Sequence, residues 1–222
     1  MQNSMKLKKI SVTAILCAVA YLCMFLFRFK VSFLTFDFKD AVFAVIAFLY
    51  GPVYGILSSL VVALVEFVTV SDTGVYGLIM NFLSSATFSA VCGLFYKYRR
   101  TLSGAVLGSV IAVISMTAVM LVANIFITPF YMGAERAVVI SMIPTLLLPF
   151  NLIKGVINAA VTMIIYKPVT GIFKKTGLMP SGNIKTNKKS FVWLSLAAAG
   201  VIFVAVLVII FVLKGSFEFV SN

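Results

Sequence analysis

Residues 143–166 decide the fold, and they read IPTLLLPFNLIKGVINAAVTMIIY. The stretch is long and apolar enough to cross the roughly 30 Å hydrocarbon core of a bilayer as one helix. Within it, Asn151, Lys154 and Asn158 follow an i, i+3, i+7 spacing, so they share one face of a helix. An ionisable side chain at this depth costs about 2.5–3.5 kcal/mol on insertion scales and usually marks a substrate or ion pathway. We therefore interpret this face as one wall of a polar pocket.

Similar apolar runs recur along the chain and predict an all-α membrane protein. Hydrophobic residues make up 62% of the sequence and charged residues only 11%, which excludes an ordinary soluble domain. The runs cover residues 10–27, 41–50, 53–70, 75–96, 105–127, 143–166 and 191–213. We expect six transmembrane helices in one bundle and a seventh, C-terminal transmembrane helix.

The spacing of these runs predicts the domain organisation. The second run is short and ends at Gly51-Pro52, a helix stop followed by a residue suited to a first helical turn. We expect a substrate-binding membrane domain over residues 1–176, a cytoplasmic linker over 177–190, and an additional helix with a short outer tail over 191–222. The first run could imitate a secretory signal, but its length and the spans behind it favour an uncleaved first helix.

The net charge of +12 is distributed by membrane side. If the N-terminus is inside, the outer segments hold only five basic residues, namely Arg28, Lys30, Lys39, Arg136 and Lys214. The cytoplasmic segments hold Lys6, Lys8, Lys9, Lys97, Arg99, Arg100, Lys167, Lys174, Lys175, Lys185, Lys188 and Lys189. This asymmetry predicts a cytoplasmic N-terminus in the cell membrane. Basic clusters that face anionic lipid need no nucleic-acid partner to explain them.

The sequence lacks the residues that most enzymes need. It contains no histidine and no GxxxxGK[ST] phosphate-binding loop, and its six acidic residues form no evident catalytic pair. The three cysteines all fall within apolar runs and predict neither a disulfide nor a metal site. We therefore expect no enzyme, no metal and no cofactor. Energy for any uphill transport must come from another subunit or from a coupled ion.

Polar residues of three helices are predicted to meet in the outer third of the membrane. Asn81 and Ser85 lie near the outer half of the fourth helix, Asn124 lies late in the fifth, and Asn151 and Lys154 begin the sixth. Such a cavity suits a flat, polar and mostly uncharged organic molecule. In the alternative interpretation, these amides and hydroxyls only form hydrogen bonds between helices.

Two further features accompany this predicted pocket. Residues 28–40 form an outer loop. Apolar and polar side chains alternate over residues 29–38, which predicts an extended segment lying across the outer surface, and Asp37 is expected to cap the helix that follows. Glu66 is the other ionisable group inside an apolar run. It is expected to pair with Lys154, to contact the ligand, or to be hydrated near the outer surface.

Several motifs together resemble the S components of energy-coupling factor vitamin transporters, most closely the riboflavin-specific members. The resemblance runs from the first helix to about Lys175. It rests on Ala14-xxx-Ala18, FDFKD at 36–40 leading to GPVYG at 51–55, NFL at 81–83, and PFNLIKG at 149–155. It assigns no role to the seventh helix, which lies beyond the six-helix pattern.

The resemblance implies a function and a set of roles. A six-helix subunit would capture riboflavin from outside and dock, through Ala14 and Ala18, onto a transmembrane coupling subunit driven by two cytoplasmic ATPases. Asn124, Asn151 and Lys154 would hydrogen-bond the flavin. Asn81 would complete the polar wall and the loop at 28–40, which contains Phe36 and Asp37, would cover it. An S component for another vitamin or precursor, and a stand-alone ion-coupled carrier that uses Glu66, remain as alternatives.

Overall fold

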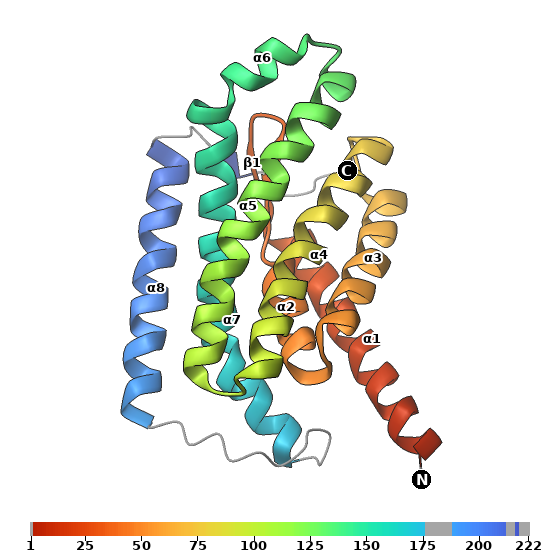
Figure 1. Cartoon of the computed structure of the whole chain (residues 1–222), viewed down its shortest axis with the longest axis vertical. Helices are drawn as coiled ribbons and strands as arrows, with labels where there is room; N and C mark the ends of the chain where they lie inside the picture. The colour runs from red at the N-terminus through yellow and green to blue at the C-terminus, as the bar shows by residue number, and fades with distance from the viewer. Residues whose placement is uncertain (1, 176–187, 212–215, 218–222) are drawn as a thin grey trace.

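The structure is a computed structural model in which residues 2–175, 188–211 and 216–217 are described. It is a helical bundle with a small three-stranded sheet at one end (Figure 1). The elements are α1 (Gln2–Leu26), β1 (Phe29–Val31), β2 (Leu34–Phe36), α2 (Lys39–Tyr50), α3 (Pro52–Thr69), α4 (Gly74–Tyr98), α5 (Leu102–Met132), α6 (Arg136–Ser141), η1 (Ile143–Leu147), α7 (Leu148–Lys175), α8 (Lys188–Phe211) and β3 (Ser216–Phe217). Below, the hairpin end is the end of the bundle that carries β1 and β2.

The seven expected helices are present, and the prediction of an all-α membrane protein is confirmed. Six of them are long and apolar enough to cross a membrane, within the described part of the chain. These candidate spans are Lys6–Leu26, Pro52–Thr69, Gly74–Tyr98, Leu102–Met132, Ile143–Phe173 and Val192–Ile210. The exception is α2, because its 12 residues extend only about 18 Å.

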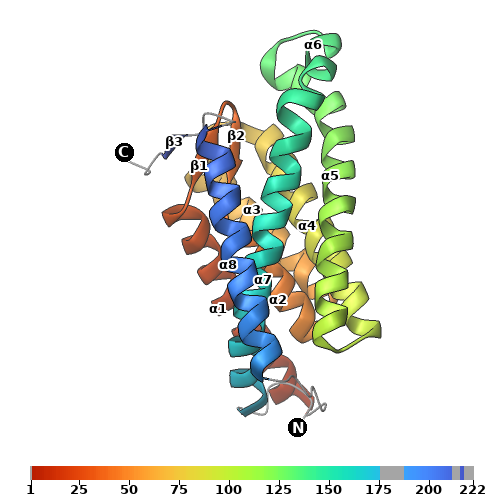
Figure 2. The same cartoon turned by 90° about the vertical axis from the view of Figure 1, so that its left-hand side faces the viewer.

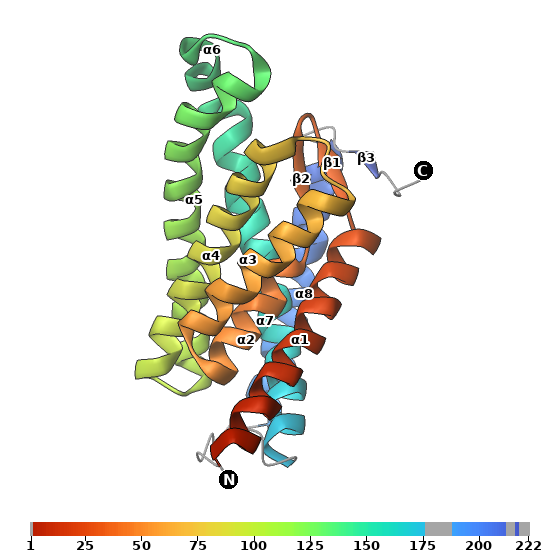
Figure 3. The same ribbon diagram turned by 90° about the vertical axis from the view of Figure 1, so that its right-hand side faces the viewer.

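The short helix α2 lies at the centre of the bundle. All of its residues from Lys39 to Leu49 are buried, and it packs against α1, α3, α4 and α7. It ends at Gly51, whose φ of 101° favours glycine, and Pro52 then opens α3. The predicted stop and restart at Gly51-Pro52 is therefore confirmed. Figure 3 shows α1 leaning across α3 on the outside of this centre.

The expected extended segment is a β-hairpin. Strands β1 and β2 pair antiparallel, with Phe29 opposite Phe36 and Val31 opposite Leu34. A third strand, β3, pairs antiparallel with β1, so the sheet order is β2-β1-β3 (Figure 2). The C-terminal end of the described chain therefore returns to the hairpin end.

The start of α2 differs from the prediction. Phe38 occupies the N-cap position that the sequence analysis assigned to Asp37. The Asp37 carboxylate still stabilises the helix start, because its Oδ1 accepts a hydrogen bond of 3.2 Å from the backbone N–H of Lys39. The other Asp37 oxygen, Oδ2, lies 3.3 Å from the Lys39 ammonium and 3.1 Å from that of Lys154.

The apolar run at 143–166 does not form a single regular helix. It begins with a π-helical turn, Ile143–Leu147, and continues as α7. Pro149, the second residue of α7, has no N–H to donate to the carbonyl one turn earlier, which disfavours regular winding here. π-helical turns within helices frequently lie at functional sites.

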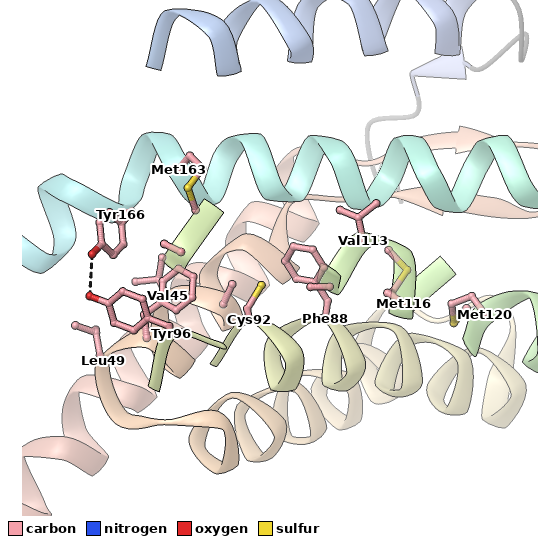
Figure 4. Packing of buried hydrophobic residues seen from close by; sticks show 14 residues of the cluster. Val45, Leu49, Phe88, Cys92, Tyr96, Val113, Met116, Met120, Met163 and Tyr166 are labelled. Carbon is pink, nitrogen blue, oxygen red and sulfur yellow. Dashed lines mark hydrogen bonds between the residues drawn. The ribbon is translucent and has the colours of Figure 1, made fainter. Parts of the chain in front are cut away.

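Apolar side chains fill the bundle away from the hairpin end. The largest buried cluster joins α2, α4, α5 and α7, and Figure 4 shows Tyr96 and Tyr166 at one extreme of it. Their hydroxyls are 2.8 Å apart and both rings pack on Phe48. These three rings pack together at this end of the cluster, whereas buried polar residues gather nearer the hairpin.

The seventh helix, α8, lies along α7 on the outside of the bundle (Figure 2). It begins at Lys188, so the last residues of the predicted linker belong to the helix. Residues 176–187, which contain most of that linker, lie outside the described residues.

Candidate functional site

A cavity of about 250 Å³ opens at the hairpin end, between the hairpin, α3, α4, α5 and α7. The hairpin contributes Ser32, Phe33, Leu34 and Thr35. Farther in, the wall carries six polar side chains, namely Glu66, Asn81, Ser84, Asn124, Asn151 and Lys154. Segments far apart in sequence therefore supply one mixed polar and apolar lining.

Five residues predicted from the sequence lie on this wall. They are Glu66, Asn81, Asn124, Asn151 and Lys154. Four helices, α3, α4, α5 and α7, bring them together because each side chain lies in the half of its helix nearest the hairpin.

The other three predicted residues lie behind the wall. Phe36 is 3% exposed, and its ring centroid lies 4.2 Å from that of Phe150, which does line the cavity. Asp37 is buried beside Lys154. Ser85 donates its hydroxyl proton to Asp40, and the neighbouring Ser84 lines the cavity instead, because adjacent helix positions point about 100° apart.

A cluster of charged side chains includes Glu66 and Lys154 of the cavity wall and extends behind it. Its members, each at most 7% exposed, are Asp37, Lys39, Asp40, Glu66 and Lys154. The Lys39 ammonium lies 2.7 Å from Glu66 Oε2 and 3.3 Å from Asp37 Oδ2, and Lys154 lies 3.1 Å from the same Asp37 oxygen. The two ammonium groups thus pair with two of the three buried carboxylates, those of Asp37 and Glu66. The third, Asp40, accepts a hydrogen bond from the Ser85 hydroxyl.

The electrostatics of Asp37 follow from this arrangement. Burial by itself would raise the pKa of its carboxyl group, but Lys154 and Lys39 outweigh burial and hold that pKa well below its usual range. Asp37 is therefore a carboxylate at neutral pH. It fixes Lys154 in place on the cavity wall.

The environment of Glu66 differs from two of the three expectations. Glu66 is 7% exposed and pairs with Lys39, so among the described residues it neither pairs with Lys154 nor lies in open water. Its Oε1 accepts a hydrogen bond of 2.9 Å from the Asn81 amide. The remaining expectation, contact with a ligand, agrees with its place on the cavity wall.

The sequence did not predict that Lys39 and Asp40 belong to this cluster. Lys39 was expected in an outer segment, yet it is 1% exposed and begins α2. The available signal was its place between Asp37 and Asp40 at the edge of an apolar run, since a lysine flanked by two acids there is a candidate for burial.

The predicted polar face of α7 divides into two parts. Asn151 and Lys154 line the cavity, whereas Asn158 holds the start of α2. The Asn158 amide donates to Asp37 O and its Oδ1 accepts from the Ala41 N–H, each at 2.9 Å. The interpretation of this face as a pocket wall was therefore wrong for Asn158, whose amide satisfies backbone groups instead.

Several polar atoms on the wall remain available to a ligand. The amides of Asn124 and Asn151 donate to the carbonyls of Met120 and Leu147, one turn earlier in their own helices. This leaves Asn151 Oδ1 without a hydrogen bond among the described residues. Ser84 Oγ is buried and likewise has no hydrogen-bond partner in the described chain. A buried polar atom left unpaired is costly, so a ligand that pairs with it gains affinity.

The mouth of the cavity is aromatic and charged. Phe33 of the hairpin lies against Tyr131 of α5, with 6.3 Å between ring centroids, and Tyr76 of α4 also lines the opening. Lys30 and Asp72 form an exposed ion pair of 3.5 Å beside it. Flat aromatic surfaces at the rim and hydrogen-bonding groups inside suit a planar polar organic molecule.

A second surface feature lies on α1, away from the cavity. Ala14 and Ala18 are both exposed and lie one turn apart. Ile15 and Val19, beside them, are also exposed, at 64% and 41%. This face of α1 therefore presents apolar side chains, two of which are small alanines.

Comparison with known proteins identifies the family. The model of the family described as ECF transporter, substrate-specific component, matches residues 8–166. A relative from Staphylococcus aureus (strain TCH60), "Riboflavin transporter RibU", is 30% identical over 187 residues, which cover 78% of this chain and 96% of the relative. "Riboflavin transporter FmnP" of Bacillus subtilis (strain 168) is 26% identical over 174 residues, which cover 73% of this chain and 92% of that protein.

A solved structure agrees with these matches. It is described as the S component of a bacterial ECF transporter. The two chains superpose with a TM-score of 0.65 at 31% sequence identity, and the match covers 78% of this chain and 99% of the solved chain. The predicted resemblance is thereby confirmed, as is the expectation that the protein is a multi-pass membrane transport component and not an enzyme. This chain belongs to the ECF transporter family, as a substrate-specific component.

Proposed function

We propose that this chain captures riboflavin from outside the cell and holds it in the cavity at the hairpin end. The observation that carries the proposal is the cavity wall, where amide, hydroxyl, carboxylate and ammonium groups from α3, α4, α5 and α7 face one space beneath aromatic rings. Riboflavin has a flat aromatic ring system with polar edges, a hydroxylated chain and no net charge. It matches both the rim and the wall.

The relatives support this choice of ligand. Both are named riboflavin transporters and are covered almost completely by this chain. The cavity, at about 250 Å³, lies just below the about 300–1,000 Å³ of small-molecule pockets, which favours a compact ligand over a peptide. We assign Asn81, Asn124, Asn151 and Lys154 to direct contact with the flavin. Phe36, Asp37 and Ser85 support the residues that make contact.

Titration of riboflavin with the purified chain tests this proposal. Flavin fluorescence should be quenched in a saturable way, because a bound ring lies against aromatic side chains. Thiamine and biotin, added in excess, should neither displace the flavin nor raise the melting temperature of the protein. An absence of flavin binding, with a thermal shift produced by another vitamin, would assign the same scaffold to a different substrate.

Riboflavin uptake is then driven, in our proposal, by partner subunits. The chain contains no phosphate-binding loop, which agrees with energy supplied by a coupling subunit and two cytoplasmic ATPases. Ala14 and Ala18 form the docking face, since small exposed residues let another membrane helix approach closely. The positive-inside asymmetry supports a cytoplasmic N-terminus, so the hairpin end faces outwards.

Glu66 favours one alternative, a carrier that works alone and is driven by an ion. A carboxylate on the wall of a membrane cavity is a common coupling group. However, Lys39 and Asn81 already occupy both of its oxygens. Uptake of riboflavin by proteoliposomes that contain this chain alone, driven by a proton or sodium gradient, would establish the carrier and exclude the ATPase-driven mechanism.

A further inference from the structure

The helix α8 lies beyond the part of the chain that the family model matches. That match ends at residue 166, whereas α8 covers Lys188–Phe211. The six-helix pattern of the S components therefore gives this helix no role. Membrane anchoring alone does not explain it, because five other helices of the described chain are already long and apolar enough to span.

Buried packing connects α8 to the hairpin and to the cavity wall. Ala205 and Ile209 of α8 are 7% and 2% exposed, and they belong to a buried cluster with residues of the hairpin and of α7. The other buried members are Val31, Phe36, Phe150 and Ile157. Neighbouring positions of α8 face outwards, since Val204 and Ile210 are 59% and 41% exposed. One face of α8 thus packs along α7 and belongs to the buried cluster that joins α7 to the hairpin.

The three-stranded sheet provides a second, independent connection between the C-terminal segment and the hairpin. Strand β3, which follows α8, pairs with β1 along the edge that β2 leaves open, with Lys30 opposite Ser216 (Figure 2). A hairpin of two three-residue strands is marginally stable by itself, and a third strand satisfies backbone groups on its free edge. The C-terminal segment is therefore joined to the hairpin by the backbone pairing of β3 and by the buried cluster that α8 shares with it.

The hairpin with which β3 pairs is also a wall of the cavity. Phe33, Leu34 and Thr35 line the cavity, and Phe36 packs on Phe150, which lines it from α7. A ligand leaves towards the hairpin end, past this wall, because apolar side chains of the core cluster fill the bundle on the other side of the cavity.

We propose that α8 and β3 hold the hairpin over the cavity and so slow ligand release, with Ala205 and Ile209 as positioning residues. The effect on release rests on the proposed riboflavin function. The effect on the hairpin does not, because it follows from contacts present without a ligand.

The experiment compares Ile209→Ala with Ile210→Ala in the full-length chain. The two isoleucines are adjacent and lose the same atoms, but only Ile209 contacts the buried cluster. Hydrogen exchange of the hairpin amides at 29–36 is measured without ligand, and riboflavin dissociation is followed by recovery of fluorescence. We expect faster exchange and about tenfold faster dissociation for Ile209→Ala, with both unchanged for Ile210→Ala.

The other outcomes separate the proposal about α8 from the proposed riboflavin function. Hairpin exchange equal in the two variants overturns the proposal, and so does faster exchange with an unchanged dissociation rate. If the wild-type chain binds no riboflavin, the proposed function fails, while the exchange comparison still tests whether α8 holds the hairpin. If Ile209→Ala does not fold, Ile209→Val gives the same comparison with a smaller change.

Discussion

At the scale of single residues, the buried Lys39 ammonium connects two carboxylates behind the cavity. It lies 2.7 Å from Glu66 and 3.3 Å from Asp37, and it is 1% exposed. Glu66 in turn orients the Asn81 amide at the cavity wall. The polar wall therefore depends on a residue that never touches the cavity.

Replacing Lys39 with methionine should strongly destabilise the protein. The change leaves Glu66 buried without its ammonium partner, a loss of about 3–5 kcal/mol for a broken buried pair. Thermal unfolding in detergent measures the effect, with Lys97→Met on the exposed surface of α4 as the control. Adding Glu66→Gln to Lys39→Met should restore part of the loss, because the uncompensated charge is removed. Equal melting temperatures for Lys39→Met and Lys97→Met would contradict this role.

The sequence predicts part of this residue-level arrangement. Asn151 and Lys154 share one face of α7 because helical spacing is local, and the structure places both on the cavity wall. Spacing could not show that Asn158 instead binds the start of α2, or that Lys154 pairs with Asp37. Those contacts join residues more than a hundred positions apart, and tertiary packing alone determines them.

At the scale of elements, a glycine lets α4 approach the corner between α2 and α3. A Cβ added to Gly93 would lie 2.8 Å from Ala47 Cβ and 3.0 Å from the backbone of Pro52. The backbone of a helix start cannot move aside as a flexible side chain can. Close contact at this corner holds the central helix α2 in place, and with it the charged cluster at its first turn.

Gly93→Ala should therefore destabilise the bundle by about 1–3 kcal/mol, the usual cost of overpacking. The matched control is Gly200→Ala on α8, where no neighbouring atom lies within 4 Å of an added Cβ. Alanine favours a helix over glycine by about 1 kcal/mol, so the control should be neutral or slightly stabilising. Thermal unfolding of both variants in detergent distinguishes them. A Gly93→Ala protein that melts no lower than wild type would contradict close packing here.

Element boundaries were predictable where the chain itself enforces them. Gly51-Pro52 predicts the end of α2 and the start of α3, because backbone geometry permits little else. Alternation over residues 29–38 predicted extended backbone, but not that β1 would pair with both β2 and β3. Strand partners depend on distant segments, and the C-terminal β3 carries no signal of its own in the sequence.

At the scale of the whole molecule, apolar surface surrounds the bundle, and one face of α1 carries small side chains. Ala14 and Ala18 are exposed beside Ile15 and Val19. In our proposal this face meets the coupling subunit, while the hairpin end meets the outer solution. Ligand capture and docking then occupy separate parts of the molecule, so a change at one should leave the other intact.

Ala14→Trp should block docking without changing ligand affinity. The bulky indole would keep α1 away from the helix of the coupling subunit, which a small residue allows to approach closely. Co-purification of the tagged chain with the coupling subunit from its host's membranes measures docking, and flavin titration measures binding. The control is Val110→Trp on a lipid-exposed position of α5. Loss of flavin binding together with docking, or undiminished docking, would contradict the separation of the two surfaces.

The central claim is that the cavity between the hairpin and α7 is where riboflavin binds, and one comparison of affinities tests it most directly. Asn151→Ala removes an amide from the cavity wall, whereas Leu152→Ala changes the next residue, which is 37% exposed on the outside. We predict that Asn151→Ala weakens riboflavin binding by about 1–3 kcal/mol and that Leu152→Ala leaves it unchanged. Lys154→Ala should weaken binding to a similar extent. Wild-type affinity in both Asn151→Ala and Lys154→Ala would show that riboflavin does not bind in this cavity.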